Sequence, residues 1–422
     1  MPRRVNRPTH PRGGAAEVGG SDRVAALTGM RAVAALFVVG THAAFATGEL
    51  SRGYLGQVYA RLEVGVAIFF VLSGFLLFRP WIRAAAAGSK GPTVARYARR
   101  RVRRIMPAYV VTVLLAFVVY SFYSAGPNPG QSWAGLMRHL TLTQIYPVDY
   151  FVTSLHLGLS QTWSLAVEVA FYATLPLLAF VLLVLLCRGR WHPRRLLAGL
   201  GGLAIISPVW LVVLETTDWL PNSAGMWLPA HVGCFAGGMA LATWEVMGVR
   251  CRSAMLVPLA MVAFLTVATP IVGGAALGSV RWWQPLTKGV LFAVVAMLVV
   301  APLALCGPGW FARALSTKPM VWLGGISYEI FLLHVLVMAV VFEVVLRWPA
   351  FTGSLAGLFA VTLLFTIPLA WALRRLTDPR ASLRRRTAPA SDAVARAQLG
   401  KLTPPVGGST SPLPRITQGE PK

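Results

Sequence analysis

Charged side chains are scarce in this chain of 422 residues, and acidic side chains are the scarcest of all. Charged residues make up 13 % of the sequence, and 14 Asp and Glu residues stand against 39 Lys and Arg residues. Soluble domains carry about 25 % charged and about 45–50 % apolar residues, whereas 56 % of this chain is hydrophobic. The composition therefore excludes an ordinary soluble enzyme, a disordered chain and a collagen-like fibre. It indicates a protein that crosses a membrane several times.

Cysteine is also rare, and its spacing carries no recognisable motif. Each of the four cysteines lies in or beside an apolar run, without a CxxC pair or the spacing of a metal site. We interpret them as small packing residues and expect neither a disulfide framework nor a bound metal. An internal repeat is missing as well, which weakens an interpretation as an inverted-repeat transporter. The four residues are Cys187, Cys234, Cys251 and Cys306.

Long apolar stretches are what the sequence does have, and ten of them can cross a bilayer, which takes about 20 residues each. Because lipid cannot satisfy an open backbone edge, we predict an all-α bundle of about ten transmembrane helices. This domain covers residues 27–376, between a disordered basic tail at 1–26 and a second disordered tail at 377–422. The stretches lie near residues 27–46, 62–82, 105–124, 159–186, 196–214, 228–247, 254–272, 285–306, 320–346 and 353–373.

The net charge of +25 suggests a nucleic-acid partner until the positions of the basic residues are considered. They lie in short clusters between the apolar stretches, as membrane topology predicts, and not on one surface. With the N-terminus in the cytoplasm, ten spans put 32 of the 39 Lys and Arg residues inside and six outside. This asymmetry favours a multi-pass plasma-membrane protein with both termini in the cytoplasm, and it excludes nucleic acid as a partner.

Four polar residues lie deep within the predicted helices, at similar depths when each residue rises 1.5 Å. An unpartnered ionisable group costs several kcal/mol there, so such residues are functional candidates. His42 and Glu168 can form an acid–base pair, in which the carboxylate holds the imidazole and the imidazole takes a proton from an alcohol. A structural hydrogen bond between helices is the alternative, and for His334 it is an equal one. Ser73, which precedes Gly74, either permits close helix packing or lines a ligand site.

Arginines crowd the segment between the second and third stretches, where residues 96–104 contain six of them. Guanidinium groups chelate phosphate oxygens in pairs, and Arg101 and Arg104 share a helix face. The cluster predicts either a site for a phosphate-bearing substrate or an anchor on anionic lipid. Aromatic residues in the loop at 125–158 leave a similar choice between an interfacial belt and part of an acceptor site.

Four blocks of sequence, in this order, resemble the membrane-bound acyltransferase-3 family. A late block with Tyr328 and residues 331–334 resembles the family more weakly. Two departures are visible: Ala67 stands where many members have Asp, with Glu63 as the nearest carboxylate, and a C-terminal esterase-like domain is not expected. The four blocks are Arg31 and His42 with ten residues between them, GVAIFFVLSGF at 65–75, RVRRIMPAY at 101–109, and WSLAVEVAFY at 163–172.

The resemblance implies an O-acyltransferase that moves an acyl group, commonly acetyl, from cytosolic acyl-CoA to a hydroxyl group. Acyl-CoA is then a donor substrate, and no permanently bound cofactor is expected. Typical acceptors are surface glycans, glycolipids and macrolide-type antibiotics. We expect the bilayer and a separate relay or glycan-assembly protein as further partners. The alternative function is a proton-coupled transporter or a lipid or glycan flippase, with Glu168 and His334 as proton carriers.

The resemblance also implies roles for individual residues. His42 is the catalytic histidine, either as a general base or as an acyl carrier, and Glu168 supports the site. The residues expected to bind acyl-CoA are Arg31, Arg101 and Arg104, and those expected to line the substrate pocket are Ser73, Tyr109, Trp163 and His334.

Overall fold

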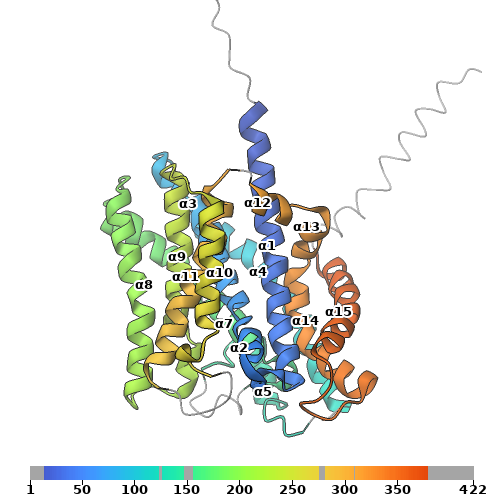
Figure 1. Cartoon of the computed structure of the whole chain (residues 1–422). Coiled ribbons are helices and arrows are strands. Elements are labelled where there is room, and N and C mark those ends of the chain that lie inside the picture. The colour runs from blue at the N-terminus through green and yellow to red at the C-terminus, as the bar shows by residue number, and fades with distance from the viewer. Residues whose placement is uncertain (1–13, 123–125, 147–154, 275–280, 308, 379–422) are drawn as a thin grey trace, which may run out of the picture. The chain divides into compact units, whose positions relative to one another are not determined.

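The computed structural model of this protein describes residues 14–122, 126–146, 155–274, 281–307 and 309–378. Over these residues the chain is helical and contains no strand, as the apolar stretches predict (Figure 1). The long helices are α1 (Gly14–Ala46), α3 (Val64–Ala86), α4 (Val94–Phe122), α7 (Thr162–Ala179), α8 (Pro193–Thr216), α9 (Leu228–Val246), α10 (Ser253–Val267), α11 (Trp283–Leu305), α14 (Ser327–Val340) and α15 (Leu355–Thr377).

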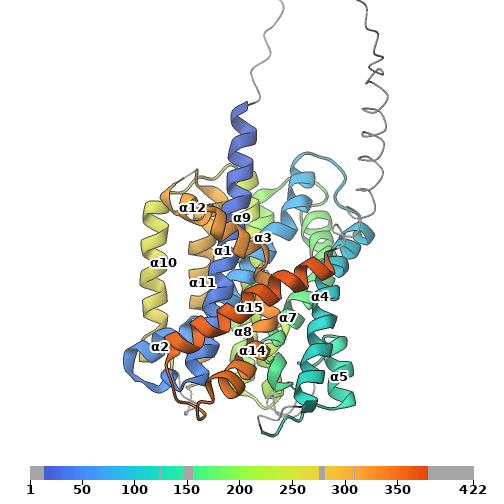
Figure 2. The ribbon, with the colours of Figure 1, turned by 90° about the vertical axis from the view of Figure 1, so that its right-hand side faces the viewer.

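Short helices connect and extend the long ones (Figure 2). The short α-helices are α2 (Gly53–Arg61), α5 (Trp133–Leu140), α12 (Trp310–Leu315) and α13 (Lys318–Gly325). Single 3₁₀ segments are η1 (Glu49–Ser51), η2 (Leu157–Leu159), η4 (Asn222–Met226) and η5 (Pro270–Val272), and the π-helical segments η3 (Phe180–Leu186) and η6 (Val341–Leu346) continue α7 and α14.

Each of the ten apolar stretches contains a helix. Eight helices among the described residues are long and apolar enough to cross a membrane. The two remaining stretches hold α9 and α10, and α10 has 15 residues, fewer than the roughly 20 that a bilayer requires. The structure thus confirms an all-α protein of membrane-spanning helices. The count of ten spans and the cytoplasmic termini stay predictions.

The first helix begins earlier than the sequence predicts. α1 starts at Gly14, inside the segment expected to be a disordered tail. No proline occurs between Gly14 and Ala46, so nothing in the backbone interrupts the helix before the apolar stretch begins. Residues 1–13 and the C-terminal tail from residue 379 onward lie outside the described residues.

Helices α3 and α9 pack closely against each other, and glycines permit the approach. A Cβ atom on Gly74 would strike the backbone carbonyl of Phe235, and one on Gly238 would strike that of Val71. Glycine is therefore required at both positions, because any side chain would force the two backbones apart. Gly74 accounts for the predicted close packing, while its neighbour Ser73 points into a cavity described below.

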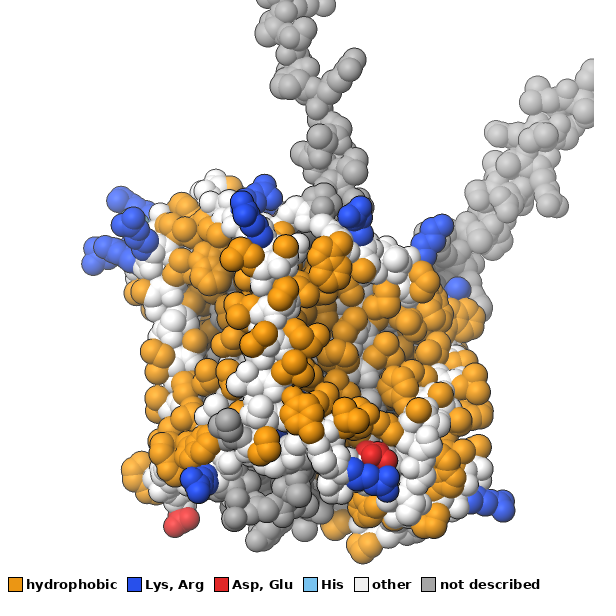
Figure 3. All heavy atoms as spheres, viewed as in Figure 1, with side chains coloured by type: hydrophobic (Ala, Val, Ile, Leu, Met, Phe, Trp, Pro, Cys, Tyr) orange, Lys and Arg blue, Asp and Glu red, His pale blue; other side chains and the backbone are white. Residues whose placement is uncertain are grey.

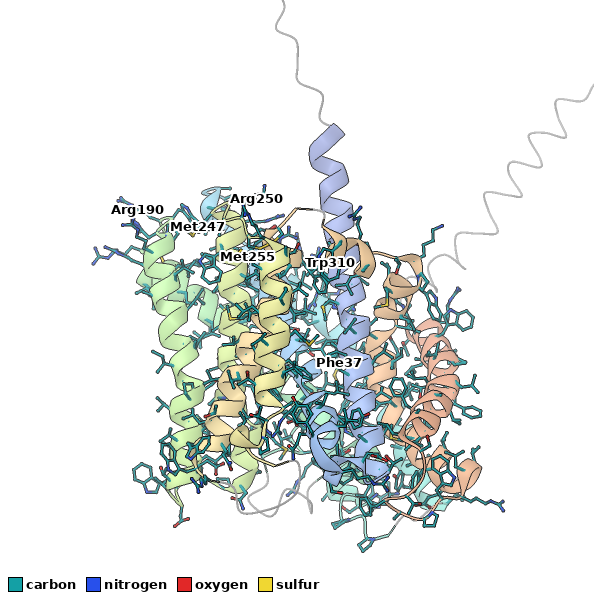
Figure 4. The ribbon with its side chains drawn as sticks, viewed as in Figure 1. Phe37, Arg190, Met247, Arg250, Met255 and Trp310 are labelled. Carbon is teal, nitrogen blue, oxygen red and sulfur yellow. A yellow bond between two sulfur atoms is a disulfide. The ribbon has the colours of Figure 1, made fainter. Side chains whose placement is uncertain are left out.

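The surface of the bundle has the distribution of a membrane protein. Figure 3 shows hydrophobic side chains across the middle of the molecule, with Lys and Arg side chains along the two rims. Arg190 and Arg250 lie at the end of the bundle where α1 begins (Figure 4). An apolar band between charged rims is expected for a surface that faces lipid.

The cysteines require a correction. Cys187 and Cys234 are buried and free, as predicted. The expectation of no disulfide is wrong for Cys251 and Cys306, which form one across 55 residues of sequence. Cys251 precedes α10 and Cys306 follows α11, and these consecutive helices pack against each other, so the hairpin brings its two ends together. A separation of 55 residues gives no hint of this contact in the sequence.

Candidate active site

One cavity of about 240 Å³ lies among helices α1, α3, α4, α7 and α14. We call it the arginine cavity. Much of its wall is apolar, formed by leucine and phenylalanine side chains that include Phe69 and Phe331. A ligand with a charged part and an apolar part suits such a lining. The polar part of the lining consists of Arg31, Ser73, Arg101, Arg104, Ser164, Glu168, Tyr172, Ser327 and Tyr328.

The three arginines of the cavity come from two helices. Arg31 lies on α1 and is half-buried, while α4 contributes the half-buried Arg101 and the exposed Arg104. None of the three forms an ion pair with an acidic residue of the described chain. The buried Nε of Arg101 has no hydrogen-bond partner there either. Guanidinium groups without carboxylate partners suit an anionic ligand, and phosphate oxygens match their planar donors.

Glu168 contributes a carboxylate to the same wall, and two hydroxyl groups donate to it. Its Oε1 atom accepts hydrogen bonds from Ser73 on α3 and from the hydroxyl of Tyr172, the latter at 2.5 Å. Tyr172 lies four residues after Glu168, so both side chains share one face of α7. Both donors are neutral and orient the carboxylate without cancelling its charge. Three guanidinium groups against one carboxylate leave the lining with a net positive charge.

His42 and His334 form a pair of contacting rings. Their centroids are 5.0 Å apart in an edge-to-face arrangement. The Nδ1 atom of His42 donates to the carbonyl of Val38 at 2.8 Å, and that of His334 donates to the carbonyl of Phe331 at 2.8 Å. Because a carbonyl oxygen can only accept, both rings carry their hydrogen on Nδ1. Each Nε2 atom therefore keeps a free lone pair, and that of His334 is buried without a partner in the described chain.

The structure shows no contact between His42 and Glu168. The hydrogen bonds of Glu168 come from Ser73 and Tyr172, and the ring next to His42 is that of His334. Equal depth in a bilayer fixes the height of a side chain but not the direction in which it leaves its helix.

An aromatic contact joins the arginine cavity to the histidine pair. Phe331 lines the cavity, and its ring centroid is 5.9 Å from that of His334. Phe69 lines the cavity as well and meets Phe331 edge to face at 6.2 Å. His42 and His334 do not appear among the described residues of the cavity wall. The site thus consists of a charged cavity and a histidine pair, with an aromatic contact between them.

Comparison with known proteins decides the family. A family of proteins that share an acyltransferase domain matches residues 24–375, which is most of the chain. The chain belongs to this acyltransferase family. The match identifies these residues as an acyltransferase domain and confirms the predicted enzyme class.

Three relatives illustrate the range of this acyltransferase family. Peptidoglycan O-acetyltransferase OatA of Listeria monocytogenes is 27 % identical over 328 residues, which cover 74 % of this chain and 49 % of that protein. Acyltransferase MdmB of Streptomyces mycarofaciens is 28 % identical over 337 residues, covering 75 % of this chain and 79 % of that protein. O-acetyltransferase OatA of Staphylococcus aureus is 24 % identical over 315 residues, covering 73 % and 49 %. The chain thus matches about half the length of the OatA proteins. No solved structure matches it.

Besides His334, two further residues predicted to line the substrate pocket of this acyltransferase lie outside the cavity wall. The hydroxyl of Tyr109 donates to the carbonyl of His139 at 2.6 Å, and the ring of Trp163 packs on that of His231. Tyr109 is five residues after Arg104, and Trp163 is five residues before Glu168. Five residues turn a side chain about 140° around a helix, so neither aromatic ring faces the cavity.

Two tyrosines of the acyltransferase cavity were not among the predicted site residues. Tyr172 donates to Glu168, and its spacing of four residues from that carboxylate is a signal the sequence contains. Tyr328 on α14 donates to the carbonyl of Ile105 at 3.0 Å and so ties α14 to α4 beside Arg104. This second contact joins segments 223 residues apart, and nothing local in the sequence indicates it.

Proposed function

We propose that this acyltransferase moves a short acyl group, acetyl foremost, from cytosolic acyl-CoA to a hydroxyl group of an acceptor at the plasma membrane. The observation that carries the proposal is the arginine cavity. In it, three guanidinium groups that have no ion-pair partner among the described residues meet an apolar wall inside a bundle of membrane helices. Acyl-CoA combines phosphate groups with a long, thin arm that ends in a thioester, which suits both parts of this wall.

The donor enters, on this proposal, from the end of the bundle that carries Arg101 and Arg104. Arg31, Arg101 and Arg104 bind the phosphate oxygens through paired N–H donors. The arm lies along the apolar wall, and Ser73 and Tyr172 hold the Glu168 carboxylate beside it. Glu168 is then available to accept a hydrogen bond from an N–H or O–H group of the arm through its other oxygen.

His42 acts as the general base in the transfer. Its Nδ1–H is held by the carbonyl of Val38, which leaves Nε2 free to accept the proton of the acceptor hydroxyl. The hydroxyl oxygen attacks the thioester carbonyl, the carbon–sulfur bond breaks, and the thiolate leaves and is protonated by the imidazolium. The buried Nε2 of His334, in the adjacent ring, has no partner in the described chain and offers a second proton acceptor beside His42.

For the acceptor we propose a glycan or glycolipid of the cell envelope, with a macrolide-type metabolite as the runner-up. The relatives within the family support this choice of acceptor. One relative is named for peptidoglycan O-acetylation, and the chain covers 79 % of MdmB but about half of the OatA relatives. Mass spectrometry of envelope glycans and small metabolites, comparing a deletion strain with its parent, tests this choice through the loss of one acyl group from one molecule.

Membranes that contain the full chain provide the test of the reaction. They are incubated with [¹⁴C]acetyl-CoA, and label is counted in the lipid, glycan and small-molecule fractions. We expect His42→Ala to lower the transferred label by at least about 100-fold, the range for loss of a general base, while the amount of protein in the membrane stays the same. His192→Ala, at a histidine that lies outside both the cavity and the histidine pair, is the matched control and transfers normally. Transfer at the wild-type rate by His42→Ala would overturn the mechanism, and binding of no acetyl-CoA by the wild type would overturn the donor.

A further inference from the structure

Two phenyl rings line the arginine cavity, and one of them contacts the histidine pair. Phe331 on α14 is 7 % exposed, and Phe69 on α3 is half-buried. Their rings meet edge to face, with centroids 6.2 Å apart and an angle of 67° between their planes. The ring of Phe331 also packs on that of His334. Both rings thus line the cavity, and Phe331 joins its wall to the histidine pair.

The position of this aromatic pair relates to the end of the donor that reacts. The charged end of an acyl-CoA belongs with Arg101 and Arg104, so its acyl end points toward the opposite end of the cavity. There the thioester must approach His42, whose neighbouring ring is already in contact with Phe331. The carbon chain of the acyl group consequently lies against Phe69 and Phe331.

We propose that Phe69 and Phe331 determine the length of the acyl group that this enzyme accepts, restricting it to acetyl and similarly short chains. The proposal rests on the proposed function and adds specificity-determining residues to it. Protein interiors are close-packed, so a chain with extra methylene groups has to displace one of the rings. Phe331 cannot move without disturbing its contact with His334, and a cavity of about 240 Å³ offers little other space.

Binding of acyl-CoA measures this selectivity without knowledge of the acceptor. Full-length protein in lipid nanodiscs is loaded with [¹⁴C]acetyl-CoA, which is then displaced by unlabelled acetyl-, butyryl- or hexanoyl-CoA. For the wild type we expect that hexanoyl-CoA is needed at about tenfold higher concentration than acetyl-CoA, the range for over-packing a filled site. In Phe331→Ala and Phe69→Ala the ratio of hexanoyl- to acetyl-CoA affinity should rise by about tenfold, because each variant removes a ring that the longer chain must displace.

Two further variants keep the result interpretable. Phe331→Leu retains an apolar side chain and should raise the same ratio by a smaller factor, which provides a reading if the alanine variant does not fold. Phe342→Ala removes a phenyl ring on η6, which directly continues α14 but does not line the cavity, and should leave the ratio unchanged.

The possible failures are distinguishable. A wild type that binds acetyl-CoA, loses it in Arg101→Ala, and shows an unchanged hexanoyl-to-acetyl ratio in both phenylalanine variants would overturn this inference alone. A wild type that binds no acetyl-CoA would overturn the proposed function and the inference with it. An equal rise of the ratio in Phe342→Ala would show that loosening of the helix, and not the aromatic pair, changes selectivity, and would also overturn the inference.

Discussion

The described chain contains two pairs of contacting histidines, and their ring nitrogens are used in opposite ways. His42 and His334 lie within the helix bundle, on α1 and α14. His139 and His156 lie between α4 and α7, on α5 and just before η2, with ring centroids 6.2 Å apart. Both pairs combine two imidazoles with aromatic neighbours, so residue type and contact alone do not distinguish them.

We call His139 and His156 the outer pair, and His42 and His334 the inner pair. In the outer pair all four ring nitrogens have hydrogen-bond partners. His139 Nδ1 donates to the carbonyl of Gly135 at 2.8 Å, and its Nε2 accepts from the backbone N–H of His156. His156 Nε2 donates to the side-chain oxygen of Gln131 at 2.6 Å, and its Nδ1 accepts from the backbone N–H of Gly158. Burial lowers the pKa of His139 and lowers that of His156 to about 3. The pair is therefore neutral at pH 7 and holds this part of the chain together.

In the inner pair only one nitrogen of each ring has a partner, and that partner is a carbonyl of the ring's own helix. The second nitrogen of each ring is free to accept a proton. A histidine whose nitrogens are all bound cannot take up a proton without losing a hydrogen bond, whereas a histidine with a free Nε2 can. The number of ring nitrogens without a hydrogen-bond partner thus distinguishes a structural histidine from a candidate base.

The largest expected effect follows from removing the free Nε2 atom of His334. We expect His334→Gln to lower acetyl transfer by about 100-fold, within the range for loss of an acid–base group, because glutamine fills similar space but does not take up a proton. The midpoint of thermal unfolding should change little, since the partners of His334 are carbonyls already used by α14. Transfer of label from [¹⁴C]acetyl-CoA and tryptophan fluorescence during heating provide the two measurements.

A double variant checks whether the two rings act together. If they share one proton, His42→Gln combined with His334→Gln should be no slower than His42→Gln alone, as for residues that function as a unit. Multiplication of the two losses, or a wild-type rate in His334→Gln, would show that His334 is only a packing residue.

The outer pair should respond in the opposite manner. We expect His156→Ala to lower the free energy of unfolding by about 2–3 kcal/mol, because it removes two hydrogen bonds and leaves a buried gap. The turnover of the protein that remains folded should stay within about twofold of wild type. His156→Asn is the matched variant. Its Oδ1 atom can still accept from the N–H of Gly158, so its loss should be smaller. A collapse of turnover without a change in stability would contradict the structural role.

The outer pair also predicts how stability depends on pH. An unperturbed histidine has a pKa of 6.5, while folding lowers that of His156 to about 3. Below pH 6.5 the unfolded chain binds protons that the folded chain does not, so stability falls as the pH drops from about 6.5 toward about 3. Each histidine contributes a slope of up to about 1.4 kcal/mol per pH unit. His156→Asn should reduce the slope in thermal-unfolding midpoints between pH 6.5 and pH 4, and equal slopes in both proteins would refute the assignment.

The sequence predicts where the helices lie better than it predicts where they begin and end. Hydropathy over about 20 residues locates a helix because burial in lipid depends on composition alone, and every apolar stretch does contain one. Hydropathy does not predict the exact bounds of the helices or the breaks within a stretch. The stretch at 320–346 is broken near Ile326 into α13 and α14, and α1 extends back to Gly14.

Prediction of the site fails where it depends on contacts between distant segments. Arg101 and Arg104, or Glu168 and Tyr172, share a helix face, and their spacing indicates this directly. The contact of His42 with His334 and the disulfide of Cys251 with Cys306 depend on how helices are rotated and paired. Helix rotation is set by packing of the whole bundle, which no local pattern specifies.

The smallest expected effect comes from the tyrosine hydroxyl groups of the arginine cavity, not from the histidine rings. Tyr172→Phe removes one of the two hydrogen bonds to Glu168 and retains the ring. Loss of one hydrogen bond to a charged group costs about 1.5 kcal/mol, so kcat/KM for acetyl-CoA should fall about tenfold. Tyr328→Phe is the matched control, because Tyr328 lines the same cavity but its hydroxyl donates to the carbonyl of Ile105 and not to a carboxylate. It should change kcat/KM by less than Tyr172→Phe does. Equal losses in the two variants would mean that the cavity needs both tyrosines for its shape, and that the orientation of Glu168 does not control binding of the donor.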